Sequence, residues 1–198
     1  MTVHTVRKIL IESLPVLGIV LVFALIAGQF LDYTLEGLKI IFPLILLMVP
    51  AFIDITGDLA GVVGARVTSH LYTGELDASF RPYRLLFANL FAVILVSATA
   101  YAFLGVCVIG IILWISPIIG PIFPAWGLPW LFLAIIGAGV LATACTSMIG
   151  LFSARLVYRF GRDPDSVIPP LTTTVGDLLG IVFIALAIIG IGTILGLI

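Results

Sequence analysis

The chain has 198 residues, of which 62% are hydrophobic and only 10% are charged, with a formal net charge of −1 and a mean hydropathy of +1.35. This composition excludes a soluble globular domain and favours a polytopic membrane protein. The apolar runs are long, whereas a transmembrane β-barrel would show short segments of alternating hydrophobicity. We therefore expect an all-α integral membrane protein.

Five apolar segments are long enough to cross a bilayer, which takes about 20 helical residues. A short amphipathic lead of about 12 residues precedes the first, and short connections separate the others. We expect residues 1–198 to form a single membrane domain, with no soluble domain attached. The five predicted spans are residues 13–31, 38–72, 85–115, 131–152 and 167–197.

The second span differs from the others because residues 38–72 are too many for one straight crossing. Pro43 and Pro50 interrupt its first half, and glycines and aspartates fill its second half. We expect the helix to be broken or kinked near Pro50, which would free backbone groups to bind ions. The alternative is an ordinary proline kink between packed helices.

The placement of Lys and Arg predicts the orientation of the chain. With a cytoplasmic N-terminus, only Lys39 of the nine basic residues lies outside. The positive-inside rule therefore predicts a cytoplasmic N-terminus and an external C-terminus in the cell membrane. The second and fifth spans then run in opposite directions. The basic residues on the cytoplasmic side are Arg7, Lys8, Arg66, Arg81, Arg84, Arg155, Arg159 and Arg162.

A short motif occurs twice, once in each of these two spans. Residues 57–61 read GDLAG after Pro50, and residues 176–180 read GDLLG after Pro169. Repeats of opposite direction in a membrane protein commonly meet at a shared site near the middle of the bilayer. The pattern therefore predicts an inverted repeat whose two copies converge.

Asp177 is the aspartate of the second copy. It lies about 11 residues beyond Ser166, or about 16 Å along a helix, which is close to the middle of a core about 30 Å thick. A carboxylate at that depth is costly unless it faces a polar cavity or a cation, so it predicts a functional site. The alternative is a protonated aspartate that is hydrogen-bonded to a neighbouring helix.

The polar residues near these aspartates are oxygen donors. Asp54 and Asp58 are four residues apart and share a helix face. Carboxylates, threonine hydroxyls and carbonyls exposed at glycines are ligands for hard cations, and Mg²⁺ often binds through one or two carboxylates while it keeps several waters. The predicted metal ligands are Asp177, Asp58 and Asp54, and the predicted lining residues are Thr173, Thr174, Gly176, Thr56 and Gly57.

The sequence contains no arrangement of Ser, His and Asp for nucleophilic catalysis and no nucleotide-binding fingerprint. We expect the protein not to be an enzyme and to need no cofactor. An intramembrane aspartyl protease built on Asp58 and Asp177 is a remote alternative, because the residues before Asp177 do not match the motif of that class.

Two segments of the chain resemble the membrane domain of the MgtE magnesium channels and the related magnesium solute carriers. One begins at Pro50, passes Asp58, and continues through Ala65-Arg66-Val67-Thr68-Ser69 to Gly74 and Glu75. The other begins at Asp163-Pro164-Asp165, passes Pro169 and Pro170, and ends at Gly176-Asp177. The five-span plan agrees, so the resemblance covers nearly the whole chain.

The resemblance implies a homodimer in which the second and fifth helices line a pore at the subunit interface. It implies that Asp177 matches the pore aspartate, which holds a largely hydrated Mg²⁺. Asp58 lies where the bacterial channels more often have asparagine, so its role is closer to that in the solute carriers. The bacterial channels carry cytosolic Mg²⁺-sensing domains, and this chain is expected to lack one.

Together these features predict a channel or transporter for divalent cations, with Mg²⁺ first among them, across the cytoplasmic membrane. The first alternative is a secondary transporter coupled to H⁺ or Na⁺, such as a cation exchanger. The remote alternatives are an intramembrane enzyme and a structural subunit of a larger complex. The expected partners are the cation, the lipid bilayer and a second copy of the chain, and nucleic acid is not expected.

Overall fold

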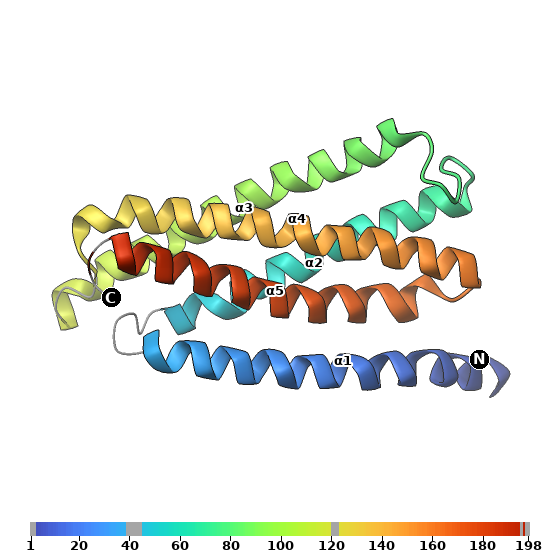
Figure 1. Cartoon of the computed structure of the whole chain (residues 1–198), viewed down its shortest axis with the longest axis horizontal. Helices are drawn as coiled ribbons and strands as arrows, with labels where there is room; N and C mark the ends of the chain where they lie inside the picture. Colours follow the sequence, from blue (N-terminus) through green and yellow to red (C-terminus); the bar gives the residue numbers. More distant parts are fainter. Residues whose placement is uncertain (1–2, 39–44, 120–122, 195, 197–198) are drawn as a thin grey trace.

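The protein is a bundle of five long helices (Figure 1). The computed structural model describes residues 3–38, 45–119, 123–194 and 196. All five helices are long and apolar enough to cross a membrane, so the predicted number of spans is confirmed. The helices are α1 (Val3–Leu38), α2 (Ile45–Tyr72), α3 (Tyr83–Ile119), α4 (Leu128–Phe160) and α5 (Pro164–Ile194), and the 3₁₀ turn η1 (Ala125–Gly127) precedes α4.

Three helices form the centre of the bundle, because α2, α4 and α5 all pack against one another. The third helix, α3, packs against α2 and α4 on one side, and α1 lies along α5 on the other (Figure 1). Successive helices alternate in direction, so the two ends of the chain lie at opposite ends of the bundle. This alternation agrees with five consecutive crossings of a bilayer.

The surface of the bundle is apolar, as expected for contact with lipid. Large side chains such as Phe103 and Trp114 are 72% and 74% exposed, while the interior combines Ile, Val and Leu side chains with alanines and threonines. Lipid tails are as apolar as the helices, so the hydrophobic effect does not drive helices together in a membrane. Helices associate there through close van der Waals packing, which small residues permit. Buried threonines and serines accompany them in α2, α4 and α5.

Several helices extend beyond the predicted spans. The lead and the first span form one helix, α1, and α4 continues past residue 152 to Phe160, where Gly161 ends it with a φ of +59°. Charged residues such as Arg155 and Arg159 therefore belong to the last turns of α4. Helical hydrogen bonding does not stop at the edge of the hydrocarbon core, which is why apolar length underestimates helix length.

The predicted break near Pro50 is not observed, because α2 is one helix from Ile45 to Tyr72 with Pro50 inside it. Pro50 lies in the second turn of the helix, so its missing N–H removes only the hydrogen bond to the carbonyl of residue 46. Membrane helices tolerate such a loss where neighbouring helices support the backbone. The predicted part of this span before Ile45 includes residues 39–44, which lie outside the described part of the chain.

Candidate functional site

The two copies of the repeated motif meet where α2 crosses α5. A Cβ atom built on Gly176 would lie 2.6 Å from the Cα of Gly57, and one built on Gly57 would lie 2.8 Å from the Cα of Thr173. Real Cβ atoms essentially never come this close to backbone atoms. The two backbones can therefore touch only because both positions are glycine.

The crossing has the symmetry of an inverted repeat. Gly61, four residues after Gly57, lies against the hydroxyl of Thr172, and a Cβ there would be 3.3 Å away. Gly180, four residues after Gly176, lies against Ile53 in the same manner, with a Cβ separation of 3.0 Å from its side chain. Each copy thus contacts the residues that precede the glycine of the other, and the prediction that the two copies converge in opposite directions is confirmed.

Each of the two contacting glycines is followed by an aspartate. Asp58 and Asp54 lie on α2 and are exposed, and Asp177 lies on α5 and is half-buried. Asp54 is close enough to Asp177 for its charge to act on that carboxyl group. The crossing therefore brings the aspartate of each copy close to the glycine contact, and it brings Asp54 within electrostatic reach of Asp177.

These carboxylates have no basic partner in the part of the chain that the structure describes. Within residues 45–119 and 123–194, the acid–base contacts join His70 to Glu75 and Asp77 to Arg81, both outside the crossing. In the described residues no three Asp, Glu, His or Cys side chains gather closely enough to hold a metal by themselves. One chain thus presents a sparse carboxylate face with free acceptor oxygens.

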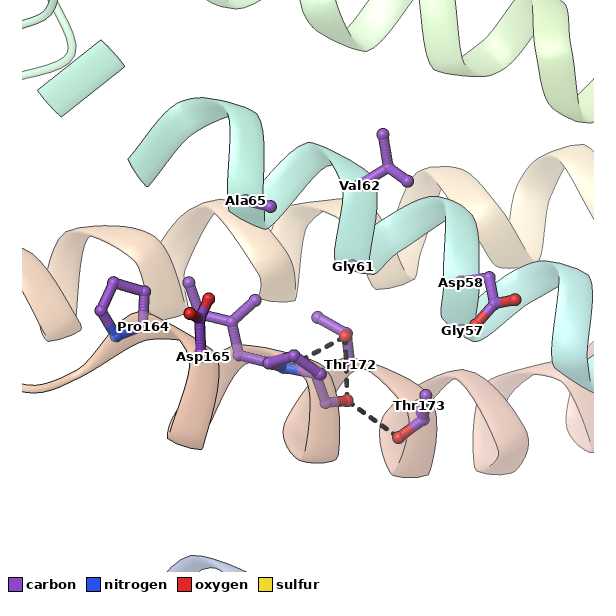
Figure 2. Close-up of a pocket in the computed structure, with 11 residues that line it drawn as sticks. Gly57, Asp58, Gly61, Val62, Ala65, Pro164, Asp165, Thr172 and Thr173 are labelled. Atoms are coloured by element: carbon purple, nitrogen blue, oxygen red, sulfur yellow. Dashed lines mark hydrogen bonds between the residues drawn. The ribbon is translucent and has the colours of Figure 1, made fainter. Parts of the chain in front are cut away.

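A cavity of about 380 Å³ lies beside the crossing, between α2 and α5 (Figure 2). Asp165 and Pro164, at the first turn of α5, lie at one end of it, and Gly57, Asp58 and Thr173 lie at the other. Its wall between these ends is formed by small and apolar residues of the two helices, among them Gly61, Ala65 and Thr172. The cavity therefore connects an acidic end of the bundle to the glycine contact.

Three consecutive threonines line the α5 side of the crossing. The hydroxyl of Thr172 donates to the carbonyl of Ile168 at 2.9 Å, that of Thr173 to Pro169 at 2.8 Å, and that of Thr174 to Pro170 at 2.9 Å. Because each hydroxyl proton is used within the helix, its oxygen lone pairs are left to accept or to bind a cation. Thr172 and Thr174 are buried, and Thr173 is half-buried.

Two prolines free further oxygen atoms near the cavity. Pro169 and Pro170 lie inside α5 and have no N–H, so the carbonyls of Asp165 and Ser166 receive no helical hydrogen bond from them. Asp165 and Pro169 both line the cavity. The first turns of α5 therefore offer backbone oxygens as well as the carboxylate of Asp165.

Thr56 and the glycines lie on the buried side of the crossing. Thr56 is fully buried, and its hydroxyl donates to the carbonyl of Phe52 at 2.9 Å and contacts the Tyr101 hydroxyl at 2.6 Å. Gly57 and Gly176 are buried where the helices touch. Of the predicted site residues, the three aspartates and Thr173 are therefore the ones with exposed or partly exposed side chains, and the role of every one of them as an ion ligand stays a prediction.

Asp165, which lines the cavity, and Tyr101, which is the partner of Thr56, were not among the predicted site residues. The position of Asp165 could have been predicted from the sequence. Pro164 marks the start of a helix, and an acidic residue in the first turn of that helix lies at the end of the bundle. A tyrosine inside an otherwise apolar span was also a signal, since a buried phenol needs a hydrogen-bond partner. Which helix supplies that partner depends on packing, and the sequence alone does not state it.

Comparison with known proteins agrees with this architecture. The family model described as MgtE, divalent cation transporter, matches residues 49–187, which include both copies of the repeat. Solute carrier family 41 member 3 of Rattus norvegicus is 24% identical over 147 residues. This alignment covers 72% of the chain and 30% of the rat protein, so the chain spans less than a third of that relative's length.

Proposed function

The chain belongs to the MgtE family of divalent cation transporters, and we propose that it carries Mg²⁺ across the cytoplasmic membrane through a site at the α2–α5 crossing. The observation that carries this proposal is the glycine contact between Gly57 and Gly176, which sets an aspartate of each motif beside the junction. In a bilayer these carboxylates need a cation or water, because the described residues offer them no basic partner.

Mg²⁺ fits this face better than a fully dehydrated ion does. It releases its water reluctantly and commonly binds through one or two carboxylates, with water filling its other positions. A face of few carboxylates, on which the charge of Asp54 reaches Asp177, suits an ion that keeps most of its hydration shell. Asp177 is the central ligand of the proposed site, and Asp54 and Asp58 attract and pass the ion.

The cavity between α2 and α5 is the proposed route from the cytoplasmic end. The carboxylate of Asp165, and its carbonyl, which receives no hydrogen bond from Pro169, meet the ion at the mouth. Asp58 and Thr173 lie at the inner end. Oxygen atoms along such a route accept hydrogen bonds from the water molecules that the ion keeps, so the ion is held weakly enough to move on.

A second copy of the chain would complete the site. Asp54 and Asp58 are exposed on the surface of the single chain, and exposed carboxylates within the hydrocarbon region are unstable against lipid. In a homodimer with the two crossings facing each other, both sets of carboxylates line one pore at the interface. A particle mass of twice the 21.1 kDa chain mass in light scattering supports this arrangement, and a strictly monomeric active protein contradicts it.

Flux through purified protein in liposomes tests the proposal. Wild type should load Mg²⁺, and Asp177→Asn should lower the rate about tenfold or more, because the amide lacks the charge that offsets the lost hydration. Glu75→Gln is the matched control, since it changes a carboxylate in the loop after α2, away from the crossing. Equal rates for Asp177→Asn and wild type would overturn the site, and absence of Mg²⁺ flux in wild type would overturn the function.

A secondary transporter coupled to H⁺ or Na⁺ is the second candidate. The observation that favours it is the inverted repeat, because many secondary transporters place their sites between such repeats. Mg²⁺ flux that requires an imposed H⁺ or Na⁺ gradient would select this candidate. Flux driven by the Mg²⁺ gradient and membrane potential alone would select the channel.

A further inference from the structure

We propose that the hydroxyl of Tyr101 is a positioning group for the ion site, because it holds α2 in the rotation that presents Asp54 and Asp58. This inference rests on the proposed Mg²⁺ site and adds a residue that lies outside it. Tyr101 comes from α3, which contributes no side chain to the cavity or to the carboxylate face.

The ring of Tyr101 is fixed in the centre of the bundle. It is fully buried, and its centroid lies 4.8 Å from that of the Phe52 ring. Gly139 of α4 leaves the space that the ring occupies, since a Cβ at that position would lie 2.3 Å from the ring. The phenol therefore has one position, and its hydroxyl must find partners there because water is excluded.

The hydroxyl of Tyr101 finds those partners on two other helices. It lies 2.6 Å from the hydroxyl of Thr56 and 3.3 Å from the carbonyl of Phe52, both on α2. It also lies 3.4 Å from the hydroxyl of Thr143 on α4. Thr56 and Thr143 are themselves fully buried. One phenol hydroxyl thus joins α2, α3 and α4 in a network that is closed to solvent.

This network lies directly behind the proposed ion site. Thr56 is the residue before Gly57, and it is two positions from both Asp54 and Asp58, which is about 200° around a helix. The hydrogen bond between Tyr101 and Thr56 therefore fixes the rotation of α2 about its own axis. That rotation decides the direction in which Asp54 and Asp58 project from the opposite face of the helix. Pro50 makes this support necessary, because its missing N–H weakens the preceding turn of the same helix.

The rotation of α2 matters for Mg²⁺ in particular. Mg²⁺ needs nearly octahedral geometry with short distances to oxygen, even when several ligands are waters. Residues that orient the ligands from behind contribute to affinity, and their loss typically weakens a metal site about 10-fold to 100-fold. We expect the lower end of this range here, because Thr56 does not contact the aspartates and acts through the helix backbone.

Tyr101→Phe tests the inference, since it keeps the ring in its place and removes only the hydroxyl. We expect the KM for Mg²⁺ uptake into liposomes to rise about 10-fold while the maximal rate changes little. The apparent Kd, from the rise in Tm of the purified protein with Mg²⁺ concentration, should rise by the same factor. Thr143→Val removes the longest contact of the network and should raise both constants by a smaller factor.

Control variants separate positioning from general stability. Val157→Ala opens a small cavity in the buried cluster at the other end of α4, so it should lower Tm and leave KM unchanged. Tyr158→Phe removes a hydroxyl from a tyrosine that pairs with Tyr72, and it should change neither constant. Thr56→Ser keeps the hydroxyl that contacts Tyr101 and should restore most of the affinity that Thr56→Val loses.

The outcomes are distinguishable. The inference is supported if KM and Kd for Mg²⁺ rise in Tyr101→Phe but stay at their wild-type values in Val157→Ala, when the two variants lose the same amount of Tm. Unchanged constants in Tyr101→Phe together with Mg²⁺ uptake by wild type overturn the inference alone. If Tyr101→Phe does not fold, unchanged constants in Thr143→Val and Thr56→Val overturn it. Wild type that neither binds nor transports Mg²⁺ overturns the proposed function, and the inference falls with it.

Discussion

At the residue scale, the Gly57–Gly176 contact is the tightest constraint on the site. Gly176→Ala places a methyl group 2.6 Å from the Cα of Gly57, and neither backbone can yield without moving its helix. We expect a loss of about 1–3 kcal/mol of stability, the usual range for an added group in a packed interior. The added methyl group should also push α2 and α5 apart, which would move the aspartates of the proposed site and abolish Mg²⁺ uptake.

Gly137→Ala is the matched control for this prediction, because a Cβ there meets nothing within 4 Å. Its Tm in detergent and its uptake rate should stay close to those of wild type, or improve slightly because alanine favours the helix. If Gly176→Ala and Gly137→Ala had the same Tm and the same uptake, the backbone contact between α2 and α5 would not be required.

At the scale of the element, α5 combines a membrane helix with two interior prolines near its first turn. Pro169→Ala supplies the N–H that the carbonyl of Asp165 lacks, so α5 should become more stable by about 1–3 kcal/mol. Once the carbonyl of Asp165 accepts a hydrogen bond from this N–H, its oxygen is less available to an ion at the mouth of the cavity. Uptake at Mg²⁺ concentrations below KM should therefore fall, by about threefold if that oxygen acts as one weak ligand among several.

Pro15→Ala is the control for this prediction, because Pro15 lies inside α1, which contributes no residue to the cavity between α2 and α5. It should raise Tm in the same direction and leave uptake unchanged. Uptake that rises with Tm in both variants would mean that the prolines affect only stability, and that the carbonyl at the mouth takes no part in transport.

At the scale of the whole molecule, arginines gather at one end of the bundle. The turn between α2 and α3, the turn between α4 and α5, and the N-terminus share one end of the bundle (Figure 1). Five of the arginines lie in or next to these two turns, namely Arg81, Arg84, Arg155, Arg159 and Arg162. The positive-inside rule predicts that this end is cytoplasmic.

Cysteine labelling checks this orientation. In a background with Cys107→Ser and Cys145→Ser, a membrane-impermeant maleimide applied to whole cells should not react with Ser79→Cys, in the turn after α2. It should react with Ala125→Cys, which lies in η1 at the opposite end and is exposed. The reverse pattern would invert the topology and would place the mouth at Asp165 outside the cell.

Much of the fold was predictable from the sequence, because the number of spans follows from the length of the apolar runs. The ends of the helices were less predictable. Arg155 and Arg159 continue α4 beyond the apolar run, and Pro50 lies within α2 without ending it. Helices continue where backbone hydrogen bonds are satisfied, and that depends on neighbours as well as on hydropathy.

The candidate site was predictable in its chemistry and less so in its geometry. By itself the sequence determined that Asp58 and Asp177 belong to a repeated glycine-aspartate motif in two helices of opposite direction. Only the tertiary structure decided that Gly57 touches Gly176, and that Thr56 points inward to Tyr101. The reason is physical: composition and spacing decide which residues share a helix face, but the rotation of each helix is set by the residues of other helices that pack against it.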